Sequence, residues 1–292
     1  MSKNEYLIEK RLYDLNPELH KRFSDSIFVL LKLLNDYTQY FPEYTDHAET
    51  HSLSVIENCN HLMGEKNIKR LNADELYVLL MGCYLHDVGM GTPMKDYDEF
   101  CEHIDFGDFF ETHEDPDPRD VIRSFHNDFS ACFIYKYAKL FDFPSYEHMF
   151  AVTQTARGHR KADLYDERWY PDLVTLDNSN TVCLPYLAAI VRMGDEVNVD
   201  MHRNTKLLFD PEKATTYKQR MENAKHEAIR RMTIYPDRIE LDVQTDDEEV
   251  YTAVEKLADK LQQTLEYCVK VVEDRTTYQI TQEKVIILDR NF

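Results

Sequence analysis

The residues with the clearest chemical potential are an adjacent histidine and aspartate, His86 and Asp87. They follow residues 79–85, where almost every side chain is apolar. A helix that is apolar all round must be buried on every side, and a buried imidazole and carboxylate are costly unless something pairs with them. Gly89 and Gly91 are expected to end this helix and open a loop. Two interpretations are open: a metal site, or a hydrogen bond between His86 and Asp87 alone.

Further candidate ligands lie on two other apolar segments. Asp195 ends residues 183–195, a predicted buried helix whose Pro185 suits a first turn. Gly194 removes a side chain beside Asp195, so a neighbouring helix or ligand can come close. His51 precedes the apolar positions of another predicted helix. Histidines and carboxylates spread over several buried helices favour the metal interpretation.

These segments resemble the signature segments of the HD-domain metal-dependent phosphohydrolases. The segments are His51-Ser52-Leu53-Ser54-Val55, His86-Asp87-Val88-Gly89-Met90 and Arg192-Met193-Gly194-Asp195-Glu196. The resemblance extends over residues 41–200 and implies a helical HD domain whose metal ligands are His51, His86, Asp87 and Asp195. The lead-in at residues 44–47 is similar to HD domains of bacterial conflict systems.

Two more histidines, His126 and His159, lie between the His-Asp pair and Asp195. In some HD proteins two histidines in this order hold a second metal, so the resemblance implies the same role here, with Asp87 bridging two ions. Related sequences often carry His-His where this chain has His126-Asn127. The expected cofactor is therefore one or two divalent transition-metal ions.

Imidazole and carboxylate ligands suit Fe, Mn, Co, Ni or Zn better than Mg, which prefers oxygen alone. A site with open coordination positions activates water for attack on phosphorus. Asp87 is then a catalytic residue. His47, one helical turn before His51, either protonates the leaving group, contacts phosphate, or only hydrogen-bonds at the helix end.

The basic residues nearest the candidate ligands are expected to hold phosphate through charge-assisted hydrogen bonds. Arg157 is assigned to catalysis, and the substrate-binding residues are Arg123, Arg160 and Lys161. The predicted function is a metal-dependent phosphohydrolase acting on a phosphate ester or anhydride of a nucleotide or similar small molecule. The alternative is a non-catalytic HD module that senses a nucleotide or binds a partner protein. The complete set of candidate ligands favours the enzyme.

Composition limits the possible partners. The 292 residues carry a net charge of −20, with a pI near 5.0. Such a surface repels long polyphosphate chains and gives no electrostatic footprint for bulk nucleic acid, although a small nucleotide in a locally basic pocket is compatible with it. No apolar run approaches the ~18 residues of a spanning helix, so no membrane partner is expected.

The cysteines indicate a reducing compartment. All six lack CxxC pairing, and Cys83 and Cys183 fall within apolar segments. Residues 1–12 are charged and lack the apolar core of a signal peptide. The predicted location is cytoplasmic.

The predicted fold is mainly α, with a helical HD domain at residues 1–210 and a small α+β appendage at residues 211–292. The appendage pattern comprises a charged helix at 213–231, a hairpin at 233–243, an amphipathic helix at 248–274, and strands at 278–280 and 285–288. The apolar stripe of the amphipathic helix needs cover, so the appendage is expected to pack against the helical domain or a second copy of the chain, making a homo-oligomer possible.

Four expectations concern the intervening segments. Asp74 is expected to cap the apolar helix that leads to His86 and Asp87, and one helix is expected to run from Arg123 to Leu140. Residues 95–120 carry eleven acidic residues against two basic ones, so they form either a solvated loop or a lid over the site. Residues 163–181 contain the only tryptophan, Trp169, and form either a surface loop or a wall on which a nucleobase stacks.

Overall fold

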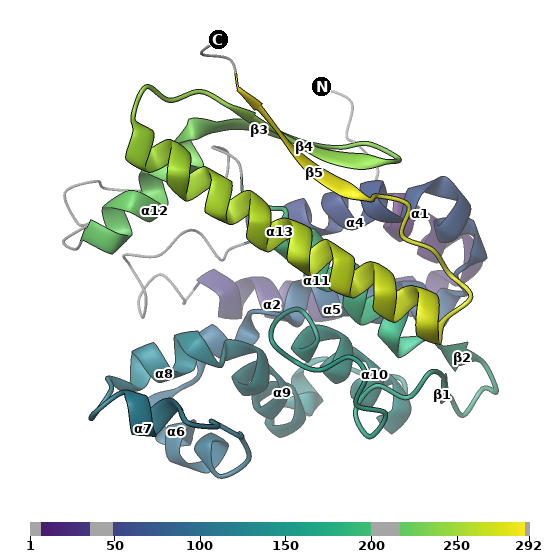
Figure 1. Cartoon of the computed structure of the whole chain (residues 1–292). Helices are drawn as coiled ribbons and strands as arrows, with labels where there is room; N and C mark the ends of the chain where they lie inside the picture. Colours follow the sequence, from purple (N-terminus) through teal and green to yellow (C-terminus); the bar gives the residue numbers. More distant parts are fainter. Residues whose placement is uncertain (1–6, 36–48, 200–216, 290–292) are drawn as a thin grey trace.

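The computed structural model describes residues 7–35, 49–199 and 217–289 (Figure 1). The fold is mainly α-helical with strands in the C-terminal part, as predicted. His47 lies outside the described residues, so its predicted role is not addressed by the structure. Within the described ranges, every helix is too short or too polar to traverse a lipid bilayer.

The central element is helix α5 (Ala73–Leu85). The first helices of the chain pack on it: α1 (Leu7–Leu15), α2 (Pro17–Asn35) and α4 (Glu49–Arg70). Every residue of α5 from Asp74 onward is buried, and the helix contacts α1, α2, α4 and two later helices. The predicted cap was wrong: Asn72 and Glu75 form a capping box, and Asp74 lies inside the first turn.

After α5 in the sequence, the chain turns sharply and contacts helix α9. The elements here are η1 (Val88–Gly91), α6 (Met94–Cys101), α7 (Phe109–Thr112), α8 (Pro118–Ser124), α9 (His126–Lys136) and η2 (Ala138–Leu140). A Cβ atom on Gly89 would overlap the backbone of His126 and Ser130, so only glycine lets α9 approach this closely.

Two sequence predictions for this region were wrong. The acidic residues 95–120 are not one continuous loop, since they contain α6, α7 and the start of α8, whereas the lid alternative stays a prediction. The expected single helix from Arg123 to Leu140 is broken at Phe125, where α8 ends and α9 begins at His126, and the last turn is a separate 3₁₀ helix. The break places His126 at a helix start, beside the Asp87 turn.

Helices α10 (Tyr146–Arg157) and α11 (Leu184–Glu196) complete the helical core, joined by a short hairpin of β1 (Val174–Thr175) and β2 (Thr181–Val182). Pro185 lies in the first turn of α11, as predicted. A Cβ atom on Gly194 would lie 2.7 Å from the Cys59 sulfur and 3.1 Å from the Val55 carbonyl oxygen. The expected close approach at this glycine is therefore real, and its partner is α4.

The C-terminal part contains a three-stranded sheet and one long helix. Its elements are α12 (Tyr217–Ala228), β3 (Ile229–Ile234), β4 (Arg238–Val243), α13 (Glu248–Arg275) and β5 (Lys284–Asp289). Strand β4 pairs antiparallel with β3 and parallel with β5. The predicted hairpin, long helix and final strand are confirmed. The strand predicted at residues 278–280 was wrong, and the charged helix ends at Ala228, before residue 231.

Helix α13 packs along α11 rather than standing apart (Figure 1). Its apolar stripe is buried at Val250, Val254, Leu261 and Leu265. At its end, an ion pair of 2.7 Å joins Arg275 to Asp172 in the segment that precedes β1. The expected packing against the helical part of the same chain is thus present, and α13 also contacts α12 and β5.

Candidate metal centre

Six predicted ligand residues converge from five helices or helix ends. His51 lies on α4, His86 and Asp87 follow α5, His126 starts α9, His159 follows α10 and Asp195 lies on α11. The four histidines and Asp87 are buried, whereas the Asp195 side chain is 20% exposed. The convergence depends on the helix ends, because each one directs a ligand toward the same interior point.

The first group of ligand atoms comprises His51, His86 and one oxygen of Asp87. The His51 and His86 Nε2 atoms lie 3.1 Å apart, and Asp87 Oδ2 lies 3.6 Å from His51 Nε2 and 3.4 Å from His86 Nε2. Asp195 Oδ1 lies 3.3 Å from His51 Nε2 and 3.8 Å from His86 Nε2. His51, His86 and Asp87 have the composition and spacing of a metal-ligand cluster, and Asp195 lies beside them.

The second group uses the other oxygen of Asp87. Asp87 Oδ1 lies 3.2 Å from His126 Nε2 and 3.7 Å from His159 Nε2. The two imidazole nitrogens are 2.9 Å apart. Asp87 therefore joins two buried groups, each capable of holding an ion.

Hydrogen bonds at the far side of three rings fix which nitrogen faces the centre. The Nδ1 atoms of His86, His126 and His159 each lie 2.7 Å from the carbonyl oxygen three residues earlier in the chain. A carbonyl oxygen only accepts, so each Nδ1 donates, and in a neutral ring Nε2 then carries a lone pair. The Nε2 lone pairs of His126 and His159 thus face each other beside a carboxylate oxygen. A cation bound between these atoms would remove the repulsion between them. The donor set fits a divalent transition metal.

Two supporting residues were missed by sequence reasoning. The side-chain amide nitrogen of Asn198 lies 2.8 Å from His51 Nδ1, the ring atom that faces a backbone carbonyl oxygen at the other three histidines. The Ser130 hydroxyl donates to the His86 carbonyl oxygen and accepts from the Gly89 amide. Their only sequence signals are positions three residues after Asp195 and four residues after His126, which are too common to notice.

The charges of the cluster shift one another's proton affinity. Burial lowers the pKa of His86, but the Asp87 and Asp195 carboxylates outweigh burial and raise this pKa to about 10. Burial and the charges of His86 and His126 hold the pKa of His159 well below its ordinary value. Burial opposes ionisation of Asp195, yet the hydrogen bond from His51 and the charge of His86 lower its pKa. The carboxylates thus stabilise positive charge at this point.

The predicted basic residues divide into two groups. The Arg157 guanidinium is ion-paired with Asp128 at 2.6 Å and stacks over Trp169, so its described contacts are with these two residues. Arg123 is half-buried, and its carbonyl oxygen orients His126. Arg160 lies closest to the ligands, with a guanidinium nitrogen 3.4 Å from His126 Nδ1, and Lys161 stacks over Phe125.

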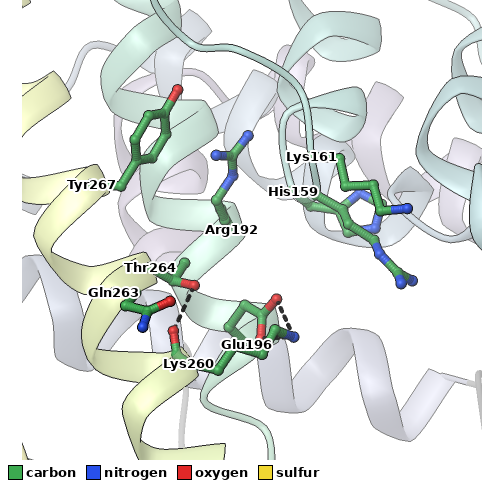
Figure 2. Close-up of a pocket in the computed structure, with 9 residues that line it drawn as sticks. His159, Lys161, Arg192, Glu196, Lys260, Gln263, Thr264 and Tyr267 are labelled. Atoms are coloured by element: carbon green, nitrogen blue, oxygen red, sulfur yellow. Dashed lines mark hydrogen bonds and ion pairs between the residues drawn. The ribbon is translucent and has the colours of Figure 1, made fainter. Parts of the chain in front are cut away.

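A cavity of about 320 Å³ opens beside His159 (Figure 2). Its walls come from the turn after α10, from α11 and from α13, through His159, Arg160, Lys161, Arg192, Glu196, Lys260, Gln263, Thr264 and Tyr267. Arg160 and Lys161 were predicted substrate-binding residues, whereas the α13 residues were not predicted to contribute to a site. His159 belongs both to the lining of the cavity and to the second ligand group.

Trp169 is 42% exposed and contacts the ion-paired Arg157. It is not among the residues that line the described cavity. This placement agrees with a surface segment anchored by an aromatic residue.

The helical fold and this ligand set define an HD-type domain. The HD-CE family model matches residues 41–277, and the chain belongs to this family. The match runs across residue 210, the predicted boundary between domain and appendage, and includes the whole of α13. Comparison with curated proteins and with solved structures found no match.

Proposed function

We propose that this protein is a metal-dependent phosphohydrolase that cleaves a phosphate ester or anhydride of a nucleotide or similar small molecule. The observation that carries the proposal is the position of Asp87, whose two carboxylate oxygens face separate buried histidine groups. A site that held an ion only for structural reasons would have no need of a second group, or of an open cavity beside it.

When bound, divalent ions at these groups would supply an activated water and screen phosphoryl charge. The residues of the chain set the geometry for that chemistry. Asp87 places one carboxylate oxygen beside each histidine group. The hydrogen bonds from Nδ1 of His86, His126 and His159 to backbone carbonyl oxygens direct their Nε2 atoms inward. Arg160 and Lys161 stand beside the ligands, where they bind phosphate oxygens through charge-assisted hydrogen bonds.

The test is a hydrolysis screen with defined metals. The full chain is freed of metal with a chelator, reloaded separately with Mn, Fe, Co, Ni or Zn, and incubated with nucleoside mono-, di- and triphosphates. We expect phosphate or pyrophosphate release with at least one metal. Asp87→Asn, which keeps the side-chain shape, should reduce the rate at least about 100-fold because it weakens both ligand groups.

The same screen addresses a non-catalytic HD module. Nucleotide binding by calorimetry, with no product formed under any metal, would contradict the enzymatic proposal and support a sensing role. Product formation that Asp87→Asn leaves unchanged would show that another site is responsible.

A further inference from the structure

The cavity beside His159 concentrates positive charge in a strongly acidic protein. Its lining includes Arg160, Lys161, Arg192 and Lys260 against one carboxylate, Glu196. Lys260 is ion-paired with that carboxylate at 2.8 Å. The chain as a whole has 54 acidic residues and only 34 Lys and Arg residues. An excess of cations at one concave site therefore calls for a specific explanation.

Three of these cations have no carboxylate within ion-pair distance in the described part of the chain: Arg160, Lys161 and Arg192. Arg192 is only 7% exposed, although a buried charge is costly without a counter-charge. Its described hydrogen bonds go to the carbonyl oxygens of Gly158, at 2.7 Å, and Ala162, at 2.6 Å. Those bonds leave further N–H donors on the guanidinium.

The turn that carries Arg160 and Lys161 places two positive charges on adjacent residues, and both residues line the cavity. Lys161 has a φ of 46°, in the left-handed region that residues other than glycine seldom adopt. An anion in the cavity would relieve the repulsion between these two side chains.

We propose that this cavity binds a second, non-reacting phosphate group of the substrate, so that the substrate carries at least two phosphates, as in a nucleoside di- or triphosphate. The proposal rests on the proposed function, because it places the reacting phosphate at Asp87. Proximity supports it: His159 lies 3.7 Å from Asp87 Oδ1 in the second ligand group and also lines the cavity. A ligand of this class spans the two.

The cavity also sets the size of the ligand and gives α13 a role in binding. About 320 Å³ lies at the small end of the ~300–1,000 Å³ range of small-molecule sites. A compact di- or triphosphate suits this volume, and the acidic surface repels longer polyanions. Lys260, Gln263 and Thr264 of α13 face the 159–161 turn across the cavity (Figure 2).

Binding is tested with methylenediphosphonate, which has two phosphonate groups and no cleavable P–O–P bond. Its affinity for the full-length, metal-loaded protein is measured by calorimetry beside that of inorganic phosphate. We expect the diphosphonate to bind more tightly. The double variant Arg160→Gln/Lys161→Gln should weaken it at least about tenfold, by loss of charge-assisted hydrogen bonds.

Two variants on the opposite wall test the contribution of α13 and α11. Lys260→Gln should weaken diphosphonate binding by about three- to tenfold, whereas Glu196→Gln should tighten it by removing the one lining carboxylate. Lys270→Gln is the matched control, since it removes an exposed cation of α13 that does not line the cavity. If the 160–161 variant fails to fold, the exposed Lys260 and its Lys270 control decide the question.

The outcomes separate this proposal from the proposed function. Unchanged diphosphonate affinity in folded Lys260→Gln and Arg160→Gln/Lys161→Gln proteins with intact metal content would overturn the second-phosphate site. So would hydrolysis that shows equal kcat/KM for nucleoside mono- and diphosphates. Diphosphonate binding with the expected variant effects but no hydrolysis under any metal would overturn the proposed function and support phosphate binding in the cavity.

Discussion

At the scale of single residues, Asp87 has the largest predicted effect. One carboxylate serves two histidine groups, with Oδ2 beside His86 and Oδ1 beside His126. Because the groups share this side chain, removing it affects both, whereas removing histidines from one group leaves the other in place. This difference gives two predictions that distinguish one metal site from two.

The first prediction concerns Asp87→Ala. Protein purified without chelator should carry about one to two transition-metal ions per chain, and this variant should lose nearly all of them. The helical fold should persist, because the helices are held by an apolar core. Elemental analysis and far-UV circular dichroism measure the two properties. Full metal content in the variant would show that Asp87 is not a ligand.

The second prediction concerns His126→Ala combined with His159→Ala. These substitutions remove the nitrogen ligands of the second group and leave His51, His86 and Asp195 unchanged. Metal content should therefore fall by about half. The measurement is again elemental analysis, with the wild type prepared in parallel. If the stoichiometry does not change, both histidines have orienting or phosphate-binding roles instead.

At the scale of elements, the metal centre depends on how closely helices approach one another. The turn after α5 meets the start of α9 at Gly89, where no room exists for a side chain. The Ser130 hydroxyl bridges the same two segments through His86 and Gly89. Packing at this contact therefore sets the distance between the two ligand groups.

The third prediction follows from that contact. Gly89→Ala should destabilise the protein by about 1–3 kcal/mol, since the added methyl forces the α9 backbone away. Metal content should fall as well, because α9 carries His126. Gly107→Ala is the control: its φ of 53° brings backbone strain, but nothing lies within 4 Å of the added Cβ. Normal metal content in a folded Gly89→Ala protein would show that the helix spacing at Gly89 does not control the geometry of the metal ligands.

A buried polar network joins α5, α10 and the β1–β2 hairpin around Asp74. Its carboxylate accepts from His148 at 2.8 Å, Asn178 at 3.1 Å and Asn180 at 2.7 Å. Burial raises the pKa of Asp74, but these hydrogen bonds outweigh burial and lower it below its ordinary value. The network thus stabilises the ionised carboxylate of the folded state.

The fourth prediction is the resulting pH dependence. A carboxyl whose folded pKa is lowered stabilises the protein above its unfolded pKa, about 4, and loses this contribution as the pH falls through the folded pKa. The melting temperature of the wild type should therefore drop more between about pH 5 and pH 2 than that of Asp74→Asn, which has no charge to lose. Parallel curves for the two proteins would mean that Asp74 does not contribute to the acid response.

At the scale of the whole molecule, the C-terminal part packs on the helical core. Helix α13 buries Leu261, Leu265 and Cys268 as it runs along α11, and it forms one wall of the cavity. The residues matched by the HD-CE family also extend through α13. Helix α13 therefore contributes both to the stability of the fold and to the wall of the cavity.

The fifth prediction is the effect of deleting residues 233–292. The deletion uncovers the apolar face of α11, so the truncated chain should aggregate or change its oligomeric state, which size-exclusion chromatography with light scattering will show. The intact chain should not bind DNA in a salt-sensitive manner, because its net charge is −20. A monodisperse truncated protein of unchanged oligomeric state and full activity would contradict the predicted packing.

The sequence by itself determined the helical class, the order of the candidate ligands and the main C-terminal elements. Local patterns sufficed for these features: an apolar run ending in His86-Asp87 marks a buried helix end, and alternation around residues 235–237 marks a hairpin. The amphipathic stripe located α13 to within one residue at its C-terminal end. Each of these signals lies within one segment of the chain.

Only the tertiary structure decided how the segments meet. The division of Asp87 between two histidine groups, the role of Asn198 and the cavity wall supplied by α13 all join residues far apart in the chain. The helix break at Phe125 and the helices of the acidic segment also differ from the sequence prediction, although the start of α8 has a local signal in the Asp117 cap and Pro118. Sequence spacing carries no distance between separate helices, so ligand types could be predicted where their geometry could not.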